Sequence, residues 1–162
     1  MEKELQFFID HEVPQVKFVD RTFNCNKKHA MAIWRYIKAH DNGINEFPLL
    51  KSVRICWMMR SWRFCQICVR GLVQLEIGVQ STNDATIQEV SRTMRLDRLA
   101  KAVHTVNVGH NIHQHLDLIA GLPYEDYDRF RQSFNDVYQM EPEQLQLGFL
   151  KVLKGSRMYD NG

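Results

Sequence analysis

The sequence predicts an α/β fold, either a partial parallel (β/α) barrel or an open parallel sheet. Two segments carry this prediction, 72–81 (LVQLEIGVQS) and 113–123 (HQHLDLIAGLP). Each is an apolar strand that contains one acid, Glu76 or Asp117, and ends in a turn with glycine, after which an amphipathic helix follows. Repeated strand, turn and helix are typical of parallel sheets. Ligands of such folds bind at the carboxyl ends of the strands, so chemistry is expected at these turns.

The other elements follow from hydrophobic periodicity and turn residues. Strands are predicted over 16–20, 72–79, 112–119 and 144–151. Helices are predicted over 3–11, 26–40, from about Asp84, over 95–107 and over 124–139. Ser81 is expected to cap the helix that begins near Asp84. The interval between the first two strands has room for two β–α units, which indicates that a strand and a helix are missing between residues 47 and 71.

Segment 50–71 does not fit this pattern. It contains no acidic residue, five basic residues, three of the four cysteines and two of the three tryptophans. A translation frameshift would explain it, because the neighbouring frame of one possible codon string encodes a strand and an acidic amphipathic helix. We therefore expect a frameshifted segment that packs poorly, with Trp57 or Trp62 exposed.

Other interpretations of this segment remain open. Cys56, Cys65 and Cys68 could ligate zinc, but a structural zinc site needs four ligands. A basic patch with the aromatic residues Trp57, Trp62 and Phe64 could bind single-stranded nucleic acid by stacking. A buried apolar helix is a third interpretation, which the arginines disfavour.

Composition sets limits on the class of protein. The 162 residues suffice for one domain, predicted over 1–162, and a net charge of +2 does not by itself imply a nucleic-acid partner. No apolar run is long enough to cross a membrane, and the charged N-terminus lacks the apolar core of a signal peptide. A cytoplasmic location with free thiols is therefore expected.

Four segments resemble the radical S-adenosylmethionine (radical SAM) enzymes: VKFVDRTFN (16–24), LEIGVQSTN (75–83), HLDLIAGLPYEDYDRF (115–130) and LQLGFLKVLKGS (145–156). The cobalamin-domain-associated group is the most similar, followed by the anaerobic coproporphyrinogen-oxidase group. This resemblance implies a partial (β/α)6 barrel that binds S-adenosylmethionine and a 4Fe–4S cluster. A complete enzyme of this kind cleaves S-adenosylmethionine reductively to a 5′-deoxyadenosyl radical.

The family holds its cluster on a C-x3-C-x2-C loop after the first strand, and this sequence has no such motif. The resemblance therefore implies a fragment with strands two to six, of which the third is disrupted. The missing N-terminal part of the parent enzyme would carry the cluster and a cobalamin domain. We expect the isolated chain to be inactive, with an unknown substrate and without nucleic-acid or membrane partners. A non-enzymatic binding module with a nucleotide-like pocket and a different (β/α) enzyme are the alternatives.

The resemblance also assigns residues to S-adenosylmethionine. Asp20, Arg21 and Thr22 would bind the methionine amino group, Gln80 and Ser81 the ribose or methionine portion, and Arg92 the methionine carboxylate. Asp117 would accept bonds from the ribose diol, and Gly121 and Pro123 would shape the turn beside adenine. Physical chemistry is consistent with these roles, because a carboxylate suits an ammonium and a guanidinium suits a carboxylate.

Each of these residues also has a structural interpretation. Asp20 to Thr22 could form a helix N-cap and turn with no role in binding, and Ser81 could serve only as a helix cap. Arg92 could be a solvated charge on a helix. An acid inside an apolar strand is costly without a partner, but Asp117 could be satisfied within the core. Gly121 and Pro123 could form a plain turn. We expect Asp20, Gln80, Ser81 and Asp117 to line one cleft.

Three further groups stay open. Glu76 could face the barrel interior or pair with a neighbouring strand. His113 and His115 share a strand face and could ligate a metal, although no third ligand is evident and satisfied strand histidines are favoured. Lys151 and Lys154 are expected to be solvated.

Overall fold

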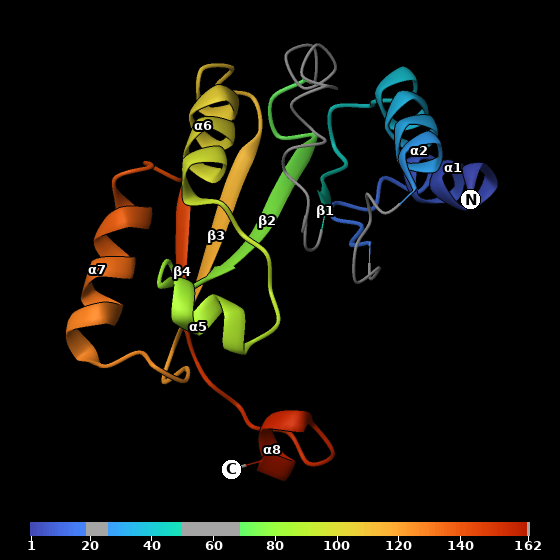
Figure 1. The fold of residues 1–162 in the computed structure, drawn as a ribbon. Helices are drawn as coiled ribbons and strands as arrows, with labels where there is room; N and C mark the ends of the chain where they lie inside the picture. The colour runs from blue at the N-terminus through green and yellow to red at the C-terminus, as the bar shows by residue number, and fades with distance from the viewer. Residues whose placement is uncertain (19–25, 50–68, 162) are drawn as a thin grey trace.

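The computed structural model describes residues 1–18, 26–49 and 69–161. Within these ranges a parallel sheet is formed by four strands: β1 (Phe47–Leu49), β2 (Val73–Gln80), β3 (His113–Ala120) and β4 (Gln144–Phe149). The spatial order β1-β2-β3-β4 follows the chain, as Figure 1 shows. Neighbouring strands are therefore consecutive in sequence, an order that an open parallel sheet and part of a (β/α) barrel share.

Helices connect and flank the strands. Their bounds are α1 Glu2–Asp10, α2 Lys27–Ala39, α5 Asp84–Glu89, α6 Leu96–Asn107, α7 Tyr127–Tyr138 and α8 Arg157–Asn161. Polar side chains cap three of them, because Asn26, Asn83 and Asp126 accept hydrogen bonds from backbone N–H groups of the first turn. None of the described helices combines the length and the apolar character that a bilayer crossing needs.

The two faces of the sheet differ in character. Along β2, Leu75, Ile77 and Val79 are buried and share one core with Leu116 and Leu118 of β3. Helices α6 and α7 pack on that face through a set of apolar side chains: Leu99, Val103, Val106 and Val137. The opposite face is polar. Successive side chains of a strand point to opposite faces of the sheet, so the core needs an apolar side chain only at every second residue.

Three predicted strands are confirmed with small shifts at their ends, over Val73–Gln80, His113–Ala120 and Gln144–Phe149. The predicted strand over 16–20 is different. In its described part the chain forms only isolated bridges, with Gln15 beside Glu46 and the Val16 N–H donating to the Glu46 carbonyl at 2.9 Å. Residues 19 and 20 lie outside the described residues. The neighbouring strand β1 lies at the start of the interval 47–71, in which the sequence pattern shows no clear strand. It has only three residues, so it offers few backbone hydrogen-bond partners to the segment that begins at residue 16.

The cap of α5 also differs from the prediction. Asn83, not Ser81, is the N-cap, and its side chain accepts from the Ala85 N–H at 3.3 Å. Ser81 accepts from the Asn83 N–H at 3.0 Å and thus shapes the turn before the helix. The expected frameshifted segment 50–71, with Trp57, Trp62 and three cysteines, lies outside the described residues except for 69–71.

Candidate functional site at the carboxyl ends of the strands

Strand β2 ends in a bulge. The register against β3 shifts between Gly78 and Gln80, and Gln80 has a φ of 73°, in the left-handed region. A bulge of this kind redirects a side chain at a sheet edge. The Gln80 amide nitrogen lies 2.8 Å from the position that a Cβ on residue 78 would occupy. Glycine at position 78 therefore leaves the space that the Gln80 amide fills.

Arg92 reaches the same point from the connection between α5 and α6. Its Nη1 donates to the Gly78 carbonyl at 2.8 Å and lies 3.5 Å from the Cβ position at residue 78. The side chain is half-buried, so burial lowers the pKa of the Arg92 guanidinium, while the charge of Asp117 acts in the opposite direction. Arg92 is thus a desolvated cation beside a carboxylate, and it does not lie on a solvated helix.

Asp117 is directly opposite Gly78 in the β2–β3 register. Its Oδ1 atom lies 3.2 Å from Nε2 of His115, and the two side chains are 24% and 10% exposed. Both line an open hollow of about 470 Å³ on the polar face of the sheet. The other residues of the hollow are all polar: Gln15, Lys17, Gln74, Glu76, Gln144 and Gln146. Glu76 therefore faces this hollow, and in the strand register it is opposite His115 of β3.

Hydrogen bonds join the loop after β2 to the loop after β3. Thr86 Oγ1 donates to the Pro123 carbonyl at 2.8 Å, and Asn83 Nδ2 donates to the Tyr124 carbonyl at 2.8 Å. Gly121 begins the second loop with a φ of 87°, a conformation that favours glycine. The turn that carries Gly121 and Pro123 is thus held by the neighbouring connection.

Ser81 belongs to this support rather than to the polar face. It is fully buried, its hydroxyl donates to a Glu125 carboxylate oxygen, and it lies 3.3 Å from the Ser133 hydroxyl. Ser133 in turn donates to Glu125 at 3.0 Å. This cluster fastens the end of β2 to the start of α7. The sequence offers Glu125 only as an acid at the start of a helix, which does not predict its contacts with Ser81 and Ser133.

The structure therefore brings three of the predicted binding residues together. Gln80, Arg92 and Asp117 surround Gly78 at the carboxyl ends of β2 and β3. Gly121 and Pro123 form the turn after β3, and Ser81 is turned away into the α7 contact. Asp20, Arg21 and Thr22 lie outside the described residues. Sequence reasoning did not weigh Gly78, although a glycine inside a strand pattern signals a bulge or a close approach.

The residues that the structure describes do not form a metal centre. No group of three His, Cys, Asp or Glu side chains among them is placed to hold a metal ion. His113 and His115 lie on the polar face, and the cysteines at 25, 56, 65 and 68 lie outside the described residues. The described residues therefore do not fit an iron–sulfur cluster, and we derive no chemical step through one.

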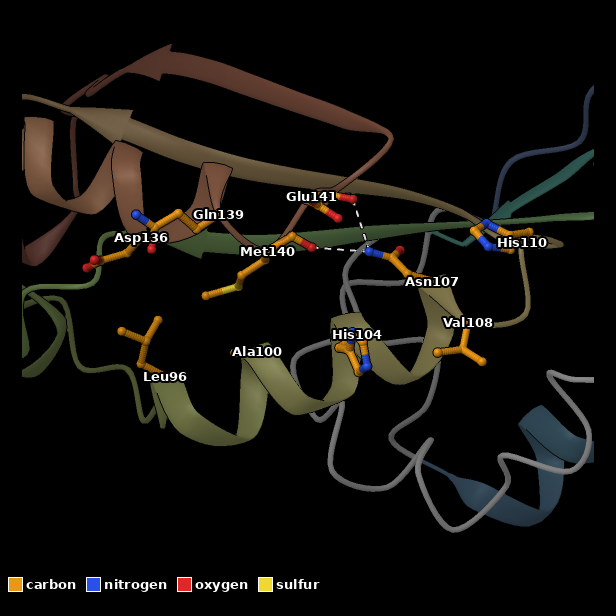
Figure 2. Close-up of a pocket in the computed structure, with 10 residues that line it drawn as sticks. All are labelled: Leu96, Ala100, His104, Asn107, Val108, His110, Asp136, Gln139, Met140 and Glu141. Atoms are coloured by element: carbon orange, nitrogen blue, oxygen red, sulfur yellow. Dashed lines mark hydrogen bonds between the residues drawn. The ribbon is translucent and has the colours of Figure 1, made fainter.

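A second hollow of about 540 Å³ lies between α6 and α7, on the helix side of the sheet (Figure 2). It is lined by Leu96, Ala100, His104 and Val108 of the α6 region and by Asp136 and Met140 of the α7 region, among others. Asn107 spans its end by donating to the Met140 and Glu141 carbonyls at 3.1 and 3.0 Å. It shares no lining residue with the polar hollow that contains His115 and Asp117.

Comparisons with known proteins bear on the fold. No protein-family model matches the chain, and no curated protein matches it in sequence. Solved structures do match. Coproporphyrinogen III oxidase (HemN) from Escherichia coli, a radical SAM enzyme, aligns with a TM-score of 0.66 at 16% identity over 94% of this chain. TsrM from Kitasatospora setae, a radical S-adenosylmethionine methyltransferase with cobalamin and a [4Fe-4S] cluster bound, aligns with a TM-score of 0.71 at 10% identity over 91% of this chain.

A second structure of TsrM, with tryptophan substrate and an S-adenosylmethionine analogue bound, aligns with a TM-score of 0.70 at 10% identity. The chain spans 38% of the HemN chain and 28–29% of the TsrM chains. At such low identity the likeness concerns the fold alone. This chain has a mixed α/β fold with a parallel sheet, similar to part of the fold of the radical SAM enzymes.

Proposed function

We propose that this chain is a fragment of a radical SAM enzyme and that it contributes part of the S-adenosylmethionine site. One observation carries the proposal: Gln80, Arg92 and Asp117 converge on Gly78, where two parallel strands end, in a fold similar to that of radical SAM enzymes. Parallel folds bind ligands at this end of the sheet.

The donor and acceptor groups suit the parts of S-adenosylmethionine. The Asp117 carboxylate can accept hydrogen bonds from the two hydroxyl groups of a ribose. The guanidinium of Arg92 can pair with the methionine carboxylate, and the Gln80 amide offers a donor and an acceptor between them. The space at Gly78 lets these side chains approach the backbone closely. S-adenosylmethionine supplies radical chemistry in such enzymes, whereas this part of the chain contributes binding and orientation.

The whole enzyme's reaction follows from this proposal only in outline. We propose reductive cleavage of S-adenosylmethionine as the activity of the complete protein, with the iron–sulfur cluster and a cobalamin domain in a part of the parent enzyme that this sequence does not include. The low coverage of the HemN and TsrM chains is consistent with a partial protein. The substrate would be set by regions outside this fragment.

Calorimetric titration with S-adenosylmethionine, adenosine and methionine tests the site. Asp117→Asn should weaken binding of both S-adenosylmethionine and adenosine by about 1–3 kcal/mol, because a charged acceptor is lost from the ribose. Arg92→Lys should weaken S-adenosylmethionine but leave adenosine unchanged, because adenosine has no carboxylate. This division between the two ligands distinguishes the assigned roles from general damage to the fold.

Matched controls exist on the surface. Arg98→Lys and Asp128→Asn change the same residue types at exposed positions and should leave both affinities unchanged. A wild-type chain that binds none of the ligands would overturn the proposal. Equal affinity of wild type and Asp117→Asn for S-adenosylmethionine would remove Asp117 from the site.

A further inference from the structure

His115 occupies a position beside Asp117 that the proposed function does not use. Its side chain is 10% exposed, and its Nε2 atom is buried and lies 3.2 Å from Asp117 Oδ1. Despite this short distance, no described atom is aligned to form a hydrogen bond with Nε2. A buried polar atom without a hydrogen bond carries a desolvation cost, so a partner that completes the bond would be stabilising.

The charged surroundings favour Asp117 as that partner. In the strand registers His115 is paired with Glu76 of β2 and with the neutral Gln144 of β4. Among the described residues, the charged or titratable groups that face it are Glu76, Asp117 and Lys17 across the hollow, and His113 two residues earlier on the same strand. Arg92 is close enough to interact electrostatically with Asp117. A proton on Nε2 would therefore lie among two carboxylates, of which Asp117 is within contact distance.

We propose that His115 is a positioning residue for Asp117: its imidazole holds Oδ1 by a hydrogen bond from Nε2 and so orients the carboxylate towards the ligand. This inference rests on the proposed function, since Asp117 is the acceptor for the ribose. Catalytic and binding hydrogen bonds are often misaligned in free proteins and tighten when the ligand arrives. A small rotation of either side chain would align the pair, whose atoms are already 3.2 Å apart.

The proposal implies a pH-dependent affinity. A protonated imidazole carries hydrogen on both ring nitrogens, whereas the neutral ring can leave Nε2 without one. Binding of S-adenosylmethionine should therefore strengthen on acidification, and calorimetry at about pH 8 and at about pH 6 measures the change. The expected gain is about threefold to tenfold, the effect of one additional charge-assisted hydrogen bond at a partly exposed site.

Two variants separate positioning from packing. His115→Gln keeps a side-chain N–H donor of similar reach, and it should bind S-adenosylmethionine with near wild-type affinity but without the pH dependence. His115→Leu fills the buried volume without a donor and should bind about threefold to tenfold more weakly at about pH 6, again without pH dependence. If His115 only fills space, the Leu variant will keep wild-type affinity and its pH profile, which would overturn the inference.

Nuclear magnetic resonance of ¹⁵N-labelled histidine tests the pair without any ligand. The chemical shifts of the His115 ring nitrogens should differ between wild type and Asp117→Asn, because the partner of Nε2 changes, while those of the exposed His104 stay unchanged. Identical His115 ring shifts in the two proteins would overturn the inference. A wild-type chain that binds no S-adenosylmethionine overturns the proposed function instead, and the histidine signals then still decide whether the pair exists.

Discussion

The two faces of β2 and β3 are built from alternating residues of the same strands, yet they differ in every property that matters for function. The helix face carries Leu75, Ile77, Leu116 and Leu118, none more than 4% exposed. The opposite face carries Glu76, His115 and Asp117 around an open polar hollow. A backbone that is held rigidly by an apolar core on one side can present charged groups in fixed positions on the other. Changes on the first face should therefore affect folding, and changes on the second should affect binding.

The largest expected effect is on the helix face. Leu116→Ala removes a side chain that is 0% exposed and should lower the free energy of unfolding by about 2–5 kcal/mol. Leu147→Ala on the neighbouring β4 is the control, because Leu147 is 52% exposed, and it should cost less than about 1 kcal/mol. Urea denaturation followed by circular dichroism measures both. Both residues lie on the helix face but differ in burial, so similar losses in the two variants would contradict the placement of Leu116 in the core.

A smaller effect is expected at the link between the two carboxyl-end loops. Thr86→Val preserves shape but removes the hydroxyl that donates to the Pro123 carbonyl and accepts from Asn83 at 3.0 Å. Because Thr86 is fully buried, we expect a loss of about 1–2 kcal/mol in the free energy of unfolding. Thr93→Val, at an exposed position, should change it by less than about 0.5 kcal/mol. An unaltered midpoint for Thr86→Val would show that the loop is held by other contacts.

The smallest change in the free energy of unfolding is expected for Gly78→Ala. The same substitution should have a large effect on the affinity for S-adenosylmethionine. An added Cβ would meet the Gln80 amide at 2.8 Å, but that amide is the end of a flexible side chain and can move. Gly78→Ala should therefore change the free energy of unfolding by less than about 1 kcal/mol. By displacing Gln80 from its place beside Arg92, it should weaken S-adenosylmethionine binding more than about tenfold, a loss of one or more hydrogen bonds.

Gly148 provides the matched control for Gly78. It lies on β4, and a Cβ there would meet nothing closer than the Leu118 carbonyl at 3.8 Å. Gly148→Ala should leave both unfolding and binding unchanged, as thermal denaturation and calorimetry can determine. If Gly78→Ala binds as well as Gly148→Ala, the polar groups at the end of β2 do not form the ligand site.

Local patterns were sufficient for the strands and helices that repeat a clear period. The strands over 73–80, 113–120 and 144–149 and the helices that follow the first two could be predicted, because alternation, turn residues and amphipathic spacing are properties of neighbouring residues. The parallel sheet followed from the strand–turn–helix repeat. Gln80 and Asp117 could be placed at one cleft from the strand pattern, together with Ser81, which the structure instead buries against Glu125. Arg92 could be assigned to the ligand only through the family resemblance.

The rest depends on contacts between distant residues. The short β1 has no period of its own and is a strand only because β2 lies beside it. The burial of Ser81 against Glu125, 44 residues away, exists only once α7 packs on the sheet. The bulge that turns Gln80 towards Arg92 is set by the register of two strands. Sequence alone determined which residues lie at the strand ends, because strand pattern is local. Tertiary structure decided which of them meet, because register, bulges and loop contacts arise only when the strands pair.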